Sequence, residues 1–140
     1  MPECSDRAWN NFVMHSDPVS YEYGSSKRAA AIASVFMGGA NKGGLNSFLT
    51  ASYDLDATEV FDALNSVDAA KAAHQLELVL HGLGTLLPAA TQDDRWARLE
   101  ERWSDDLDEH DVLARDADAE LMSVLEKHVA ANEAFYSSLD

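Results

Sequence analysis

Eight carboxylate side chains lie within sixteen residues near the C-terminal end of this sequence. If the stretch is mostly helical, the eight charges span roughly 24 Å, or about one charge per 3 Å. One strand of duplex DNA carries a phosphate per about 3.4 Å of axis, so the two linear charge densities are similar. The pattern predicts an acidic face that imitates DNA to a basic partner. The carboxylates are those of Asp105, Asp106, Asp108, Glu109, Asp111, Asp116, Asp118 and Glu120.

The overall charge supports the same type of partner. The chain has 25 Asp and Glu against 10 Lys and Arg, which gives a net charge of −15. Such a surface repels phosphate backbones and anionic lipid heads, so we expect no direct binding to nucleic acid or membranes. A basic protein is the expected partner, either a DNA-binding regulator or a nuclease. A plain scaffold domain whose acidic residues serve only solubility is the alternative.

Three side chains of one predicted helix could bind a metal. His74, Glu77 and His81 lie at positions i, i+3 and i+7, close to one face. The spacing lacks the i, i+4 histidine pair of the known helical zinc motif. We predict no bound metal or other cofactor, and keep a helical metal-binding protein as an alternative.

No pattern in the chain predicts catalysis. Cys4 lies near the N-terminus with only Arg7 nearby to activate it. The Gly38-Gly39 and Gly43-Gly44 pairs lack the Lys-Ser/Thr ending of a phosphate-binding loop, and no G-x-S-x-G is present. The sequence therefore predicts a binding protein with no catalytic residues.

Helical periodicity dominates the elements that must position these residues. It predicts an all-α fold, a single compact domain over residues 1–140 with six to eight helices. The first expected helix is capped by Ser5 and ended by Asp17-Pro18, with Ala8, Trp9, Phe12 and Val13 on its buried face. The next ones run from Lys27 to about Met37, closed by Gly38-Gly39, then from Leu45, and then from the residue after Asp56. A long helix capped by Asp68 is expected to bury Ala72, Leu76, Val79, Leu80 and Leu83. The last ones are a helix from Thr91 with Trp96, Leu99 and Trp103 on its core face, a short one around Leu107, and one over about 116–137 that buries Leu121, Val124, Leu125, Val129 and Phe135.

The location of the protein is expected to be the cytoplasm. A single cysteine allows no disulfide within the chain, which suits a reducing compartment. The first residues show no signal-peptide pattern, and the most apolar stretch, Ala29 to Ala40, is too short to span a bilayer.

A tight turn at Asn41-Lys42-Gly43-Gly44, followed by Leu45-Asn46-Ser47-Phe48-Leu49, carries a family resemblance. It resembles the Asn-Gly-Gly signature of a widespread bacterial helical family that includes a Neisseria DNA-mimic protein. Leu107-Asp108-Glu109-His110-Asp111 is similar to that family's Leu-Asp-x-x-Asp segment. The resemblance covers about residues 28–136. Lys42, Leu45 and Ser47 depart from the family pattern.

The resemblance implies an all-α fold, a homodimer and no enzymatic activity. It also implies that an acidic surface could occupy the DNA-binding face of a transcription regulator. An immunity or antitoxin protein that covers a basic nuclease would use the same electrostatics and is the main alternative. Asn41, Gly43 and Gly44 are expected to have a structural role in the turn.

Overall fold

The computed structural model describes residues 4–50, 57–82, 97 and 100–139. Within these residues the fold is all-α, with eight helical segments and no strand, which confirms the predicted fold class. None of the described helices is long and apolar enough to cross a membrane. The segments are α1 (Asp6–Met14), η1 (Pro18–Ser20), α2 (Ser26–Thr50), α3 (Ala57–Ser66), α4 (Ala70–Gly82), η2 (Asp105–His110), α6 (Arg115–Ala131) and α7 (Glu133–Ser137), where η denotes a 3-10 helix.

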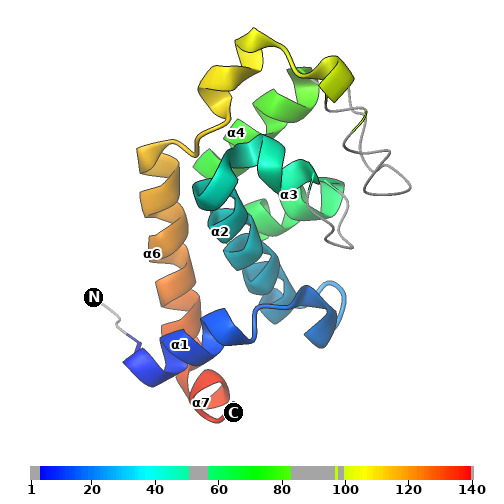
Figure 1. Ribbon diagram of the computed structural model, residues 1–140. Helices are drawn as coiled ribbons and strands as arrows, with labels where there is room; N and C mark the ends of the chain where they lie inside the picture. Colours follow the sequence, from blue (N-terminus) through cyan, green and yellow to red (C-terminus); the bar gives the residue numbers. More distant parts are fainter. Residues whose placement is uncertain (1–3, 51–56, 83–96, 98–99, 140) are drawn as a thin grey trace.

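Helix α2 lies at the centre of this arrangement (Figure 1). It packs against α3 and α6, while α4 contacts both of these helices. Five buried alanines of α2 allow this close packing, because a methyl side chain lets neighbouring backbones approach: Ala29, Ala30, Ala31, Ala33 and Ala40. Ile32 and Phe36 of the same helix are also buried, so α2 contributes to the core on several sides.

Helix α1 crosses one end of the molecule and packs mainly on α6 and α7 (Figure 1). The predicted N-cap is confirmed, since the Ser5 hydroxyl accepts a hydrogen bond from the backbone N–H of Ala8 at 3.1 Å. Ala8 and Phe12 are buried as expected. Val13, predicted on the same face, is 49% exposed. The buried face is therefore narrower than the sequence pattern indicates.

The predicted end of α2 at Gly38-Gly39 is wrong. The helix continues to Thr50 and is interrupted only at Gly44, which has a φ of 91° and a ψ of 172°. Gly39 has a packing role instead, because a Cβ at this position would lie 2.9 Å from Cδ1 of Phe48. The glycine allows the segments before and after Gly44 to pack closely together.

The predicted N-cap of α4 is also wrong. Asp68 has a φ of 66° and lies in the turn between α3 and α4. The carboxylate of Glu120, from α6, accepts a hydrogen bond from the Lys71 N–H at 3.0 Å. A side chain distant in sequence thus satisfies a donor in the first turn of α4. Ala72 and Leu76 are buried as predicted, and Leu83 lies outside the described residues.

The C-terminal segment forms two helices where one was predicted. The helix is interrupted at Asn132, between α6 and α7, and the change of direction places Tyr136 in the core. Tyr136 is fully buried, while Phe135, which was expected to be buried, is 37% exposed. Leu121, Leu125 and Val129 are buried as predicted, and Val124 is partly buried. Of the predicted tryptophan face, only Trp103 lies within the described residues, and it is partly buried.

Candidate functional site

The acidic segment is not one straight helix. Its first part is η2, the yellow segment at the top of Figure 1, and its last part is the start of α6. Residues 111–114 form a linker without helical structure. The carboxylates therefore do not follow a single helix axis, and the uniform spacing of about one charge per 3 Å does not describe them.

Asp111 has a structural role within this segment. Its carboxylate Oδ1 accepts a hydrogen bond from the Asn46 N–H, and its backbone carbonyl accepts one from the Leu45 N–H, both at 2.7 Å. These donors begin the part of α2 that follows the break at Gly44. Asp111 thus caps an interrupted helix with two acceptors from a distant part of the chain, for donors that have no partner within the helix.

Residues 41–44 of α2 and the Leu-Asp-x-x-Asp segment therefore lie against each other. A Cβ at Gly44 would lie 2.7 Å from Cγ of Asp111, so only glycine fits at this position. Asn41 strengthens the contact, because its Nδ2 donates to Oδ1 of Asp118 at 2.8 Å. The predicted tight turn over residues 41–44 is wrong, because these residues are part of α2 and the helical backbone is interrupted at Gly44.

Several other predicted binding carboxylates have partners within the molecule. Asp108 accepts a hydrogen bond from Nε1 of Trp103 at 2.8 Å, and Glu120 caps α4 as described above. The carboxylate of Asp116 lies 3.7 Å from Nζ of Lys71, with both side chains more than half exposed. An ion pair this exposed contributes little to stability. Asp111, Asp118 and Glu120 are the partly buried members of the set, so they are the least available to another molecule.

The remaining carboxylates of the set are on the surface. Asp105, Asp106, Asp108 and Glu109 of η2 are all exposed; we call these four the η2 carboxylates. Glu109 lies 3.3 Å from Nε2 of His110, and its side chain is 76% exposed. Exposed Glu100 and Glu101 precede η2 in the chain. Of the eight predicted carboxylates, those that a partner could contact are thus the four of η2 and that of Asp116.

A groove of about 470 Å³ lies beside the η2 carboxylates, between α4, η2 and the start of α6. Its floor includes Gln75, the buried polar side chain of the described core. The Gln75 amide donates to the carbonyls of His110 and Val112 at 2.8 and 2.7 Å and accepts from the Ala114 N–H at 2.9 Å. These bonds fix the 111–114 linker on α4. A lone glutamine in an amphipathic helix carries no sequence signal for such a role.

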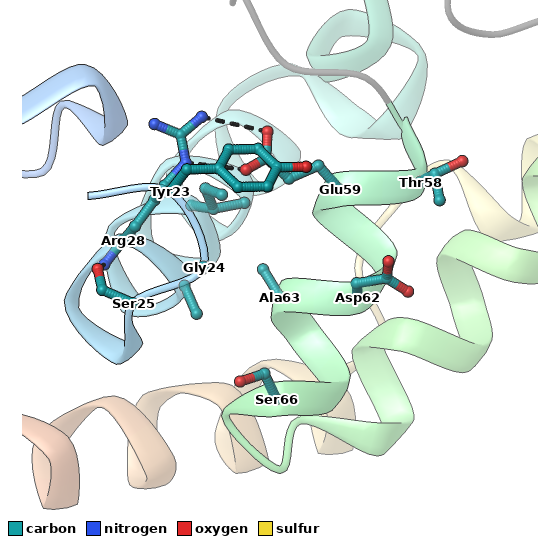
Figure 2. A pocket seen from close by; sticks show the side chains of 11 residues that line it. Tyr23, Gly24, Ser25, Arg28, Thr58, Glu59, Asp62, Ala63 and Ser66 are labelled. Carbon is teal, nitrogen blue, oxygen red and sulfur yellow. Dashed lines mark hydrogen bonds and ion pairs between the residues drawn. The ribbon is translucent and has the colours of Figure 1, made fainter. Parts of the chain in front are cut away.

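A second hollow, of about 340 Å³, lies between the start of α2 and α3 (Figure 2). Arg28 and Glu59 form a largely buried ion pair here, with Nε and Oε2 at 2.8 Å. The guanidinium also donates to the carbonyl of Pro18 at 2.9 Å and lies 5.3 Å from the ring centroid of Tyr23. The pair joins η1, α2 and α3, so its role is structural.

The candidate metal-binding residues do not form a site. Nδ1 of His74 lies 4.0 Å from a carboxylate oxygen of Glu77, and both side chains are well exposed. His81 is exposed near the end of α4. Over residues 4–50, 57–82, 97 and 100–139, no group of three or more His, Cys, Asp or Glu side chains is arranged to hold a metal ion.

Cys4 shows no sign of activation. Partial burial raises the pKa of its thiol, and the carboxylates of Glu126, Glu133 and Asp6 act in the same direction. A raised pKa leaves less of the nucleophilic thiolate at neutral pH.

Comparisons with protein families, with curated proteins and with solved structures found no match to this chain.

Proposed function

We propose that this protein binds a basic, DNA-binding protein through the η2 carboxylates and prevents that protein from contacting DNA. The observation that supports this proposal is the concentration of exposed acidic side chains on η2, in a chain with a net charge of −15. Carboxylates there would pair with the lysine and arginine side chains that otherwise neutralise phosphates. The proposal includes a cytoplasmic location and, from the family resemblance, a homodimer.

The structure narrows the residues proposed for binding. Asp111 and Glu120 cap helices and Asp118 accepts a hydrogen bond from Asn41 of α2, so their substitution would alter the fold as well as the surface charge. Asp105, Asp106 and Glu109 can be neutralised with less structural effect, because each is exposed. These three residues carry the test.

The experiment is a pull-down from nuclease-treated host lysate, eluted with a salt gradient. We expect a basic DNA-binding protein to elute at moderate salt, because screening weakens exposed charge pairs. Duplex DNA should compete with this protein for the partner. A partner with nuclease activity would identify the immunity role in place of the regulatory one. Retention of no basic protein at low salt would contradict the proposal.

A matched pair of triple variants separates a specific surface from net charge. The first variant is Asp105→Asn, Asp106→Asn and Glu109→Gln. The control is Glu22→Gln, Asp62→Asn and Asp68→Asn, which removes the same charge from exposed positions elsewhere. We expect the first variant to lose the partner and the control to retain it. Equal loss in both variants would mean that the partner senses only the overall charge.

A further inference from the structure

The groove beside η2 combines apolar side chains with fixed geometry. Leu78 of α4 is 39% exposed and Val112 of the linker is 72% exposed, and both line the groove. Three small side chains, Ala70, Ala114 and Ala117, also line it, together with the rings of His74 and His110. A hollow lined in this way can accept an apolar side chain from another molecule.

Gln75 holds this surface in place. Its three hydrogen bonds to the backbone of residues 110–114 leave the linker little freedom to rearrange. Val112 is therefore presented to solvent by a constrained backbone. A preformed apolar contact costs less conformational entropy on binding than one formed from a flexible loop.

The border of the groove is acidic. Glu109 and Asp116 line it directly, with side chains 76% and 69% exposed. Lys71, the one lysine or arginine among the lining residues, already lies 3.7 Å from Asp116. A ligand with an apolar side chain between positive charges would complement both the floor and the border.

We propose that this groove binds an apolar side chain of a basic amphipathic segment in the partner. Lysines or arginines of that segment would form ion pairs with Asp116 and with the η2 carboxylates, Glu109 among them. This inference rests on the proposed function and adds a second source of affinity to it. Charge pairs on η2 would bring the partner to this face. Burial of the apolar side chain against Val112 and Leu78 would slow its release, in a manner that salt does not screen.

The test uses two synthetic peptides of the same length and charge. The first is an amphipathic Leu/Lys helix, and the second has every leucine replaced by serine. Binding to the full chain is measured by fluorescence anisotropy at low and high salt. We expect the first peptide to bind more tightly and to retain more of its affinity at high salt.

A matched pair of valine variants locates the contact. Val112→Ser should weaken binding of the amphipathic peptide by about tenfold, the effect of losing one buried valine. Val19→Ser should leave it unchanged, because Val19 is equally exposed, at 74%, but belongs to η1. Thermal unfolding checks that both variants are folded.

The outcomes distinguish this inference from the proposed function. Equal binding of both peptides, or binding that Val112→Ser does not weaken, would contradict the proposed apolar contact in the groove and leave the electrostatic proposal intact. Failure of both peptides to bind at low salt would count against the proposed electrostatic surface as well.

Discussion

The carboxylate of Asp111 lies directly against the backbone of Gly44. The two residues belong to the two sequence motifs on which the family resemblance rests, and their contact joins the interrupted part of α2 to the acidic segment. Because Asp111 caps the helix that follows Gly44, the interruption leaves neither the Leu45 nor the Asn46 N–H unpaired. One acidic residue of the candidate surface is thus part of the fold.

Gly44→Ala is expected to destabilise the protein by about 2 kcal/mol or more. Its φ of 91° disfavours any residue with a Cβ, and the methyl group would clash with Asp111. The control is Gly38→Ala, where a Cβ would meet no atom within 4 Å. That change should stabilise α2 by roughly 0.5 to 1 kcal/mol. Urea unfolding of both variants measures the difference, and similar effects would contradict the account of Gly44.

Asp111→Ala is expected to lower the free energy of unfolding by about 1 to 2 kcal/mol, because the Asn46 N–H loses its cap. Asp105→Ala should change it by less than about 0.5 kcal/mol, since Asp105 is exposed on η2. Chemical denaturation at neutral pH tests both. If Asp105→Ala lowered the stability as much as Asp111→Ala does, the account of Asp105 as a surface residue without a structural role would be wrong.

Gln75→Leu is expected to destabilise the protein by about 2 to 3 kcal/mol. The change leaves the Ala114 N–H and the carbonyls of His110 and Val112 without their side-chain partner. Hydrogen exchange of the Ala114 amide should become faster in the variant. The control is Glu77→Gln, at a neighbouring exposed position. Neither the stability of this variant nor the exchange rate of its Ala114 amide should differ from the unmodified protein.

His128 is expected to make stability depend on pH. Burial, and to a smaller degree the charge of Lys27, lowers its pKa below the ordinary value of 6.5. The folded state then binds fewer protons than the unfolded state, so stability is full above about pH 6.5 and falls as the pH drops toward the lower folded pKa. His128→Gln should remove this part of the dependence while keeping a polar partner for the Tyr136 hydroxyl.

Unfolding at about pH 7.5 and about pH 5.5 measures the effect of His128. His74→Gln is the control, because His74 is on the surface, and it should keep the dependence of the unmodified protein. A separate loss of stability is expected below about pH 4.5, because hydrogen bonds from Ser137 and from Ser5 lower the pKa of Glu133 in the folded state. If His128→Gln keeps the full pH slope, another group is responsible for it.

Local signals were sufficient to predict much of the fold. The Ser5 cap and the apolar spacing of Ala8 and Phe12 predicted α1, since both depend on residues within two turns. The end of α2 could not be predicted in this way. Gly38-Gly39 is a helix-ending pattern by local rules, and it is overridden by a contact between Gly39 and Phe48. The cap of α4 by Glu120 is likewise invisible to spacing, because its partner is in another helix.

The candidate surface was only partly predictable. The sequence identified where carboxylates are dense, but not which of them point outward. Asp111 and Asp106 are chemically the same and close in sequence, yet one caps a helix and the other is exposed. Helical spacing could not distinguish the two residues, because Asp106 belongs to the 3-10 helix η2 whereas Asp111 begins the non-helical linker before α6.

The packing of α1 has a consequence for synthesis of the chain. Phe12 contacts His128 and Tyr136, and Asn11 donates to the carbonyl of Tyr136. On the ribosome, α1 emerges before its main partners, α6 and α7, and its contacts with His128 and Tyr136 cannot form until residues 128–136 have left the exit tunnel. Since an isolated helix this short is marginal in water, α1 would complete its folding only after residues 128–136 have emerged. Nascent chains lacking those residues should therefore leave α1 open to proteases and chaperones.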